Sequence, residues 1–340
     1  MKQKNTITTS GKSNSILGVK GLMVGHHTDT EALCGVTAVI CTEGAIAGVD
    51  VRGSAPGTRE TDLLDPVNLV EKAQAVVLSG GSVFGLAASD GVVRWLAEKG
   101  FGFPLENNQV APIVPAAVLY DLGRGRDFVP PINSEWGRKA CDNAGNDVTD
   151  TGCVGAGTGA VSGGIKGGLG TARLVLDNGI TVAALVAVNS LGSVINPLTG
   201  RPWEIGLELN GEFGNEGERA VRLPPATEGS AATNTTIGLI ATDADLSKVQ
   251  ARKIAQMAHD GMARAIRPSH TLFDGDTIFC LATCKKQLPE TQGFFPSPKA
   301  HAINELGHAA ANCMSRAIIR GVLSAQSLGG ITAFCDLEDL

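Results

Sequence analysis

The first residue that could have a chemical role is a threonine, Thr235. It lies in the stretch "SAATNTTIGLIATDA" (230–244). A run of small polar residues ends at this threonine and its neighbours, and the apolar run that follows predicts a buried strand. A threonine inside a chain is a poor nucleophile, whereas a threonine at a freed N-terminus can pass its hydroxyl proton to its own α-amine. We therefore hypothesise that the chain is cut between Asn234 and Thr235. The structural alternative is a loop end, in which the asparagine favours a turn.

A pair of carboxylates forms the second candidate. Asp274 and Asp276 flank a glycine in "SHTLFDGDTIF" (269–279), just before an expected strand. Two carboxylates spaced in this way can act on one amine or share a proton. The alternative is an Asp-Gly turn that leads into the strand.

Three further polar residues stand at places where a ligand could approach. Tyr120, the only tyrosine in the chain, ends an apolar run. Its phenol could donate a hydrogen bond into a cleft, or its ring could simply pack with the hydroxyl in solvent. Lys166 lies among glycines that allow close backbone approach, although a solvated loop lysine is the ordinary alternative. Asn189 is the last residue of an apolar strand. Its side-chain amide could donate a hydrogen bond to an oxyanion, or the residue could merely terminate the strand.

Several familiar motifs fail on inspection. "GAGTGA" (155–160) has no convincing strand before it and no stable helix after it, so a nicotinamide site is not expected. The sequence around Ser82 misses the G-x-S-x-G elbow by one position. His26 and His27 are adjacent and would point to opposite faces of a strand. The eight cysteines form no C-x-x-C pair and are expected to be reduced. We expect neither a cofactor nor a metal.

The elements that must position these residues alternate between strands and helices. A strand, a Gly-Gly-Ser turn and a helix are expected over 73–100, and Asp243 or Asp245 could cap a helix over 246–266. A long helix is expected over 300–323. The remaining expected strands are two around a turn in 35–53, then 114–123, 180–189, 236–243 and 276–284. This order predicts one layered α/β (α+β) domain over 15–340, after a polar, frayed tail over 1–14.

The segment 196–234 differs from the rest, because glycine, proline, glutamate and asparagine dominate it. So long a stretch without clear structure is uncommon inside a domain and is usually functional or disordered. We expect it to be flexible, which would let a new chain end move away after a cut at Thr235.

Composition limits the possible partners. The chain has 340 residues, of which 43% are hydrophobic, and a formal net charge of −6. It has no basic stripe, so nucleic acid is not an expected partner. No apolar run approaches the length of a membrane span, and no signal-peptide core follows the polar start, so a cytoplasmic protein without a membrane partner is expected.

Taken together and in this order, several motifs resemble the DmpA-like aminopeptidase family of N-terminal-nucleophile hydrolases, and most of all its NylC-type branch of nylon-oligomer hydrolases. The resemblance runs from about residue 15 to the C-terminus. It is carried by "VVLSGGSVFGL" (76–86), "AAVLYDLG" (116–123), "GGIKGG" (163–168), "VAVN" (186–189), "ATNTTIGLIATDA" (232–244) and "IRPSHTLFDGDTIF" (266–279).

The resemblance implies a four-layer αββα sandwich that cuts itself into 15–234 and 235–340 and assembles as a homotetramer. Thr235 matches the nucleophile and Asn234 the last residue of the larger fragment. The matching acidic pair, which orients and tunes the new amine in the nylon-oligomer branch, is Asp274 and Asp276. The serine and glutamate of the DmpA-type aminopeptidases are absent there.

The same resemblance implies roles for the other three residues. Lys166 matches a lysine of the nylon-oligomer site, Asn189 the asparagine that helps to hold the oxyanion, and Tyr120 the active-site tyrosine. The implied substrate is a small peptide with a free amino end or an oligomer of 6-aminohexanoate. Two other functions stay open: an acyltransferase of the ornithine acetyltransferase type, and a non-catalytic binding protein on the same fold.

Overall fold

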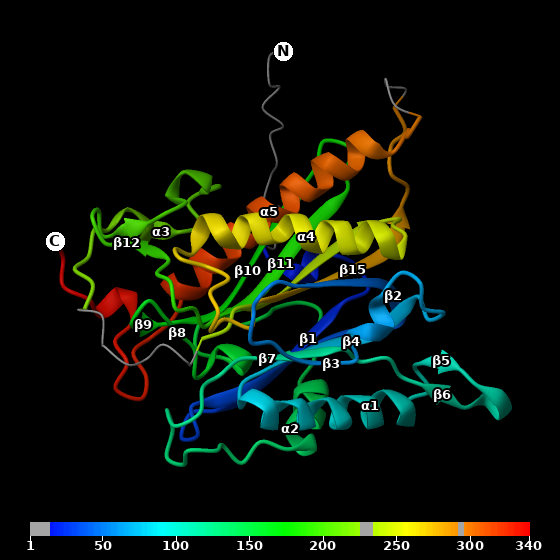
Figure 1. Ribbon diagram of the computed structural model, residues 1–340, viewed down its shortest axis with the longest axis horizontal. Helices are drawn as coiled ribbons and strands as arrows, with labels where there is room; N and C mark the ends of the chain where they lie inside the picture. Colours follow the sequence, from blue (N-terminus) through cyan, green and yellow to red (C-terminus); the bar gives the residue numbers. More distant parts are fainter. Residues whose placement is uncertain (1–13, 225–233, 292–295) are drawn as a thin grey trace.

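The fold is built on one continuous mixed sheet in a computed structural model that describes residues 14–224, 234–291 and 296–340 (Figure 1). Along the sheet, the strands follow the order β10 (Gly168–Val175), β11 (Thr181–Val188), β14 (Ile237–Ala244), β15 (Thr277–Lys286), β2 (Cys34–Val51), β4 (Lys72–Ser79), β7 (Ala116–Val118) and β3 (Gly57–Arg59). A further strand, β1 (Met23–Asp29), pairs antiparallel with β2. The strand expected over 180–189 is thereby confirmed as β11.

Helices and short hairpins complete the described part of the chain. The helices are α1 (Ala88–Glu98), α2 (Ser134–Asp142), α3 (Gly214–Glu218), α4 (Lys248–Ala265) and α5 (Ala300–Leu323). The short strand pairs are β5 (Phe103–Pro104) with β6 (Val110–Ala111), β8 (Val161–Ser162) with β9 (Ile165–Lys166), and β12 (Ile195–Asn196) with β13 (Arg201–Pro202). The long helix expected over 300–323 is confirmed as α5. None of the described helices is long and apolar enough to cross a membrane.

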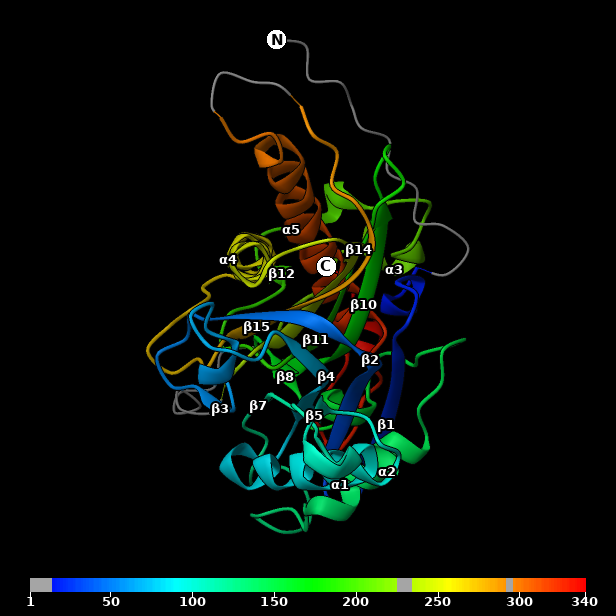
Figure 2. The ribbon, with the colours of Figure 1, turned by 90° about the vertical axis from the view of Figure 1, so that its right-hand side faces the viewer.

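Three hydrophobic cores show that the sheet folds over on itself into two layers. The first core lies between α4, α5 and the strands from β10 to β15. The second contains Leu239 and Phe279 from those strands, together with Val39 and Val76 from β2 and β4. The third lies between β2, β4 and β7 on one side and α1 and α2 on the other. Helices therefore cover both outer faces, as Figure 2 shows, and the expected αββα sandwich is confirmed.

Strand β2 joins the two layers. Its side chain at Val36 packs in the core of α1 and α2, whereas Ile46 packs in the core of α4 and α5. Its pairing with β4 shifts register between Ile40 and Ala45, where Gly44 has a φ of 71°. The expected pair of strands around a turn in 35–53 is therefore wrong. The glycine makes a bulge in one long strand, and the bulge redirects that strand from one layer to the other.

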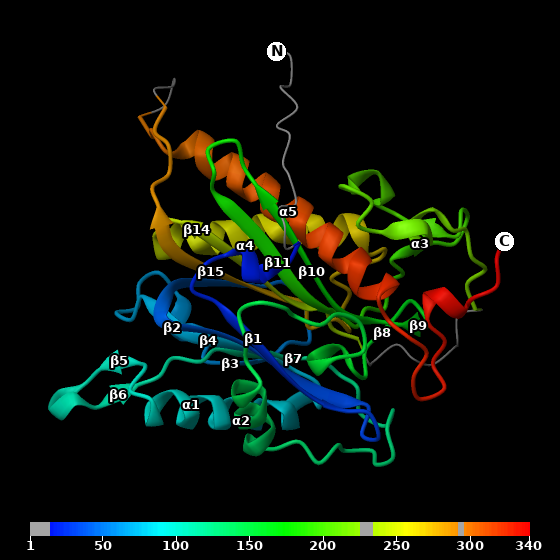
Figure 3. The ribbon, with the colours of Figure 1, turned by 180° about the vertical axis from the view of Figure 1, so that it is seen from behind.

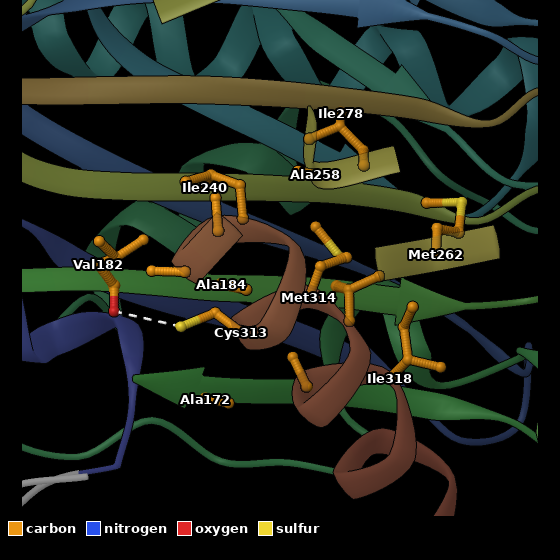
Figure 4. Packing of buried hydrophobic residues seen from close by; sticks show 14 of the residues in the cluster. Ala172, Val182, Ala184, Ile240, Ala258, Met262, Ile278, Cys313, Met314 and Ile318 are labelled. Carbon is orange, nitrogen blue, oxygen red and sulfur yellow. Dashed lines mark hydrogen bonds between the residues drawn. The ribbon is translucent and has the colours of Figure 1, made fainter. Parts of the chain in front are cut away.

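The core beneath α5 shows the alternation that a buried strand requires (Figure 4). Val182 and Ala184 of β11 point toward α5, where Met314 and Ile318 lie among them. The intervening residues of β11 face the other layer. Seen from behind, β10 and β11 run beneath α5 along much of its length (Figure 3). Because β11 is buried on both faces, its sequence is apolar without alternation.

Two local expectations need correction. Helix α4 is capped by Ser247, whose side chain forms a capping box with Gln250, so neither Asp243 nor Asp245 caps it. The strand expected over 114–123 is shorter, because the chain leaves β7 after Val118.

The segment expected to be flexible over 196–234 is ordered as far as residue 224 and is held against the C-terminal part of the chain. The carboxylate of Glu212 pairs with Arg316 of α5, with 2.8 Å between Oε2 and Nη2. The backbone N–H of Arg222 donates to the carbonyl of Glu338 at 2.8 Å. The expectation failed because turns and buried ion pairs, rather than an apolar pattern, fix this segment. Residues 225–233, like the tail 1–13, lie outside the described residues.

Candidate active site

The register of two parallel strands brings the polar residues of the site together. Ile237 of β14 lies opposite Thr277 of β15, an offset of 40 residues. An isolated parallel bridge pairs Asn234 with Asp274 at the same offset. The pairing therefore continues past the ends of the two strands, and it sets the proposed cut site against the acidic pair.

Between the two carboxylates, Gly275 lies directly against Thr235. Its backbone N–H donates to Thr235 Oγ1 at 3.1 Å. A Cβ atom at this position would lie 2.6 Å from the carbonyl oxygen of Ala55 and 3.0 Å from Thr235 Oγ1. The glycine is therefore required by the close approach of the Ala55 carbonyl and of the threonine hydroxyl.

Thr235 is held at both its nitrogen and its hydroxyl. Its backbone N–H donates to the carbonyl of Asn189 at 2.5 Å, and its hydroxyl donates to the carbonyl of Asn234, the residue before it. Only 5% of Thr235 is exposed. The hydroxyl thus lies against the carbonyl of the peptide bond whose cleavage would free the threonine amine.

Asp276 is anchored through both carboxylate oxygens. Oδ1 accepts the backbone N–H of Thr236 at 2.8 Å. Oδ2 accepts His270 Nδ1 at 2.7 Å and the His270 backbone N–H at 3.1 Å. This carboxylate therefore fixes the backbone immediately after Thr235 in the intact chain.

Asp274 is anchored through one oxygen alone. Its Oδ2 accepts the backbone N–H of Thr271 at 2.8 Å and the Thr271 hydroxyl at 2.6 Å. Its Oδ1 is buried and has no hydrogen-bond partner among the described residues. Burial raises the pKa of the Asp274 carboxyl, and the charge of Asp276 adds to this shift. The bonds from Thr271 and the nearby backbone N–H of Leu191 oppose it. A buried acceptor without a partner is costly, and such a group close to a candidate nucleophile is itself a candidate for function.

Asn189 reaches Thr235 through its backbone carbonyl, and its side chain is tied to other groups. Its Nδ2 donates to the carbonyl of Tyr120 at 3.1 Å. Its Oδ1 accepts Arg124 Nη1 at 2.5 Å and the backbone N–H of Val161 at 3.0 Å. The sequence-predicted Tyr120 is thus connected to the site through its own backbone.

Lys166 is completely buried, and its ammonium contacts three backbone carbonyls and the Cys153 side chain. Its Nζ donates to Gly157 at 3.2 Å, Ala160 at 2.8 Å and Gly167 at 3.0 Å. Burial lowers the pKa of this ammonium to about 8. Among the contacts that the described residues make, none joins Lys166 directly to Thr235. The lysine instead fastens the turn over 157–167, which includes the Val161 donor to Asn189.

Another buried carboxylate, Asp121, lies next to Lys166 and Arg124. Asp121 accepts the backbone N–H of Gly81 at 2.6 Å, and its Oδ2 has no hydrogen-bond partner among the described residues. Burial raises the pKa of Asp121 to about 6, against the opposing effects of the Gly81 N–H and the charge of Arg124.

A pocket of about 350 Å³ opens beside Asn234. Arg124, Ser190, Leu191 and Thr332 contribute to its wall. Its size is suited to a small ligand. No group of His, Cys, Asp and Glu side chains that could hold a metal ion occurs within the described residues.

The structure thus brings Thr235, Asn234, Asp274, Asp276 and Asn189 into contact. It adds several residues that the sequence did not single out. Those residues are Gly275, His270, Thr271 and Arg124. These residues, apart from Arg124, stand in one short stretch of the sequence, "SHT" and "DGD" (269–276). Only the folded structure shows that Gly275 meets the Thr235 hydroxyl and that His270 turns back onto Asp276.

A protein-family model matches most of the chain. The model of peptidase family S58 matches residues 14–334. Related sequences include proteins named as aminopeptidases and proteins named as oligomer hydrolases. An uncharacterized aminopeptidase of Mycobacterium tuberculosis is 46% identical over 95% of this chain and 98% of its own. A 6-aminohexanoate-oligomer endohydrolase of Kocuria sp. is 29% identical over 92% of this chain and 87% of its own.

Solved structures share the fold. The L-aminopeptidase D-Ala-esterase/amidase of Ochrobactrum anthropi, described as a variant of the Ntn hydrolase fold, matches with a TM-score of 0.71 and 22% identity, over 94% of this chain and 88% of its own. A β-aminopeptidase of Burkholderia sp. also matches with a TM-score of 0.71 and 22% identity, over 97% of this chain and 92% of its own. The family and fold that the sequence motifs resemble are confirmed. The chain belongs to peptidase family S58 and is a hydrolase of amide bonds.

Proposed function

We propose that this protein is a self-processing amide hydrolase whose nucleophile is the N-terminal Thr235 of a cut chain. The observation that carries the proposal is the position of the Thr235 hydroxyl, which lies against the Asn234 carbonyl and accepts the Gly275 N–H. A nucleophile held against a carbonyl has already lost most of the freedom that an attack costs.

Maturation follows from this geometry. Thr235 Oγ1 attacks the carbonyl carbon of Asn234, the C–N bond breaks, and the hydroxyl proton passes to the departing amine nitrogen. The product is an ester between Asn234 and the Thr235 side chain. Water hydrolyses this ester, which leaves a carboxylate on Asn234 and a free amine on Thr235.

Hydrolysis of a substrate repeats the same steps with the freed amine as the base. The amine takes the proton of Oγ1 as the oxygen attacks the substrate amide, and it then protonates the leaving amine. Water releases the acyl group from the threonine. The unpartnered Asp274 Oδ1 supplies an acceptor for the new amine, and Asp276 holds the chain behind it. We assign oxyanion stabilisation to Asn189 and a neighbouring backbone N–H.

Lys166 and Tyr120 act through Asn189 in this scheme. Lys166 fastens the turn that supplies the Val161 donor to Asn189 Oδ1, while the Tyr120 carbonyl accepts Asn189 Nδ2. We therefore assign Lys166 a positioning role.

The proposed substrates are small peptides with a free amino end and oligomers of 6-aminohexanoate, because relatives of both kinds match the chain. The pocket of about 350 Å³ beside Asn234 can hold one or two such units. Initial rates on a 6-aminohexanoate oligomer and on a series of aminoacyl p-nitroanilides decide between them. We place the protein in the cytoplasm and propose a homotetramer of cut protomers; sedimentation of the purified protein tests that assembly.

Intact-mass spectrometry under denaturing conditions tests the nucleophile. The full chain has a mass of 34.9 kDa, and a cut before Thr235 gives fragments of about 24 and about 11 kDa, in proportion to 234 and 106 residues. The Thr235→Ala variant is expected to stay whole and inactive. A Thr235→Ala protein that still yields these fragments contradicts the proposal, as does a parent protein that stays whole on long incubation yet hydrolyses amides.

A further inference from the structure

His270 lies behind Asp276, on the loop between α4 and β15, and directs two donors at one oxygen. Its Nδ1 and its backbone N–H both reach Asp276 Oδ2, at 2.7 and 3.1 Å. The backbone of His270 has a φ of 55°, in the left-handed region that His, Asn and Asp enter more readily than most residues. The local chain conformation is thus one that suits a small set of side chains.

The surroundings of the ring fix which nitrogen carries the proton. His270 Nε2 is buried and has no hydrogen-bond partner among the described residues. The ring of His259 meets it edge-on, with 4.9 Å between the centroids. A proton on Nε2 would therefore be a buried donor without an acceptor, which is costly. A proton on Nδ1 is donated to Asp276, and Nε2 then carries no proton that would need an acceptor.

His259 packs against the His270 ring. It lies on α4, only 1% exposed, and its Nε2 lies 3.1 Å from the carbonyl oxygen of Asp50. Burial lowers the pKa of His259 to about 4, so its ring is neutral near pH 7. The His270 ring is thus backed by a neutral, buried neighbour that is itself hydrogen-bonded to β2.

The two oxygens of Asp276 have different partners as a result. His270 holds Oδ2, and Oδ1 is left for the N–H of Thr236, the residue after the nucleophile. If the Nδ1 donor were lost, the carboxylate could turn about its last bond, and the Thr236 backbone would lose a fixed acceptor. A small displacement of a nucleophile is enough to slow a reaction severely.

We propose that His270 is a positioning residue that acts through Asp276: its Nδ1–H locks the carboxylate so that Oδ1 fixes the Thr236 N–H and, with it, the Thr235 hydroxyl against the Asn234 carbonyl. This inference rests on the proposed function, because it concerns the rate of the self-cleavage before Thr235. It assigns His270 no contact with the substrate.

A pair of isosteric variants tests the proposal. His270→Asn and His270→Asp have the same shape and both tolerate a positive φ. Asparagine can donate from Nδ2, which takes the place of Nδ1, whereas aspartate sets a second carboxylate against Asp276. The precursor fraction is followed by intact mass after cell-free synthesis. We expect His270→Asn to cut within about threefold of the parent rate and His270→Asp to cut about ten- to hundredfold more slowly.

The controls separate this inference from the proposed function. His301→Asn changes an exposed histidine and is expected to cut at the parent rate. Equal rates for the two His270 variants, whether fast or slow, overturn the positioning role, because packing and backbone alone would then explain them. If Thr235→Ala stays whole in that experiment, the proposed function survives and only the role of His270 falls. If Thr235→Ala cuts, the proposed function itself has failed.

Discussion

The two sides of Thr235 differ in how fully their polar groups are satisfied. On one side lies the acidic loop, residues 269–276, whose Gly275 contacts the threonine hydroxyl and whose Asp274 keeps a buried oxygen without a partner among the described residues. On the other lies the lysine turn, residues 157–167, whose Lys166 ammonium donates to three backbone carbonyls. The first side has an unpartnered acceptor beside the proposed nucleophile, whereas the charged group of the second side is bound by the backbone of its own turn.

This difference indicates a division of labour. A buried acceptor without a partner destabilises the intact chain, and the proposed cut would create a new amine that could serve as its partner. A lysine surrounded by carbonyls stabilises a turn and has no donor left to gain from the cut. We therefore expect the acidic loop to govern the chemistry and the lysine turn to govern the stability of the scaffold.

The largest expected effect comes from Asp274→Asn. Its amide oxygen can keep the two bonds from Thr271, which turns the amide NH₂ toward the position of the bare Oδ1. That NH₂ would face the new Thr235 amine as a second donor. We expect hydrolysis by the cut protein to fall at least about a hundredfold, while the cut itself stays within about tenfold.

Both rates are measured on the same preparation of Asp274→Asn. Intact-mass spectrometry gives the fraction of cut chain, and an amide hydrolysis assay gives the turnover per cut chain. Asp147→Asn, which changes an exposed carboxylate, serves as the matched control. Parent-like hydrolysis by the Asp274→Asn protein would show that the unpartnered oxygen does not serve the amine.

Lys166→Met tests the other side of the comparison. Methionine removes a buried charge and leaves three carbonyls without their donor, so we expect the free energy of unfolding to fall by about 3 kcal/mol. Hydrolysis per folded, cut chain should fall less than in Asp274→Asn. Chemical denaturation and active-site titration measure the two quantities. A Lys166→Met protein of unchanged stability and abolished hydrolysis would reverse the assignment and place the ammonium in the reaction.

The sequence was informative about each side to a different degree. Most of the strands and helices follow from apolar patterns, and Asp274, Asp276 and Lys166 follow from residue types. The offset of 40 residues that sets Gly275 against Thr235 depends on how two strands pair over a distance, which no local pattern encodes. For the same reason the turn of His270 back onto Asp276 and the tethering of Glu212 to Arg316 were not predictable.

The smallest expected effect concerns Asp121, behind the lysine turn. Burial raises the pKa of its carboxyl to about 6 in the folded protein, above an ordinary value of 3.8. The folded state therefore holds the proton more tightly, and the stability that this gives is complete below pH 3.8 and is lost as the pH rises through 6. Asp121→Asn cannot lose a proton, so it should melt a few degrees above the parent at pH 8, with the difference closing by pH 4. Melting curves of the two proteins across this range give the answer: a gap that stays constant with pH would mean that folding does not raise the pKa of Asp121, and its carboxylate would then be a satisfied charge behind the lysine turn.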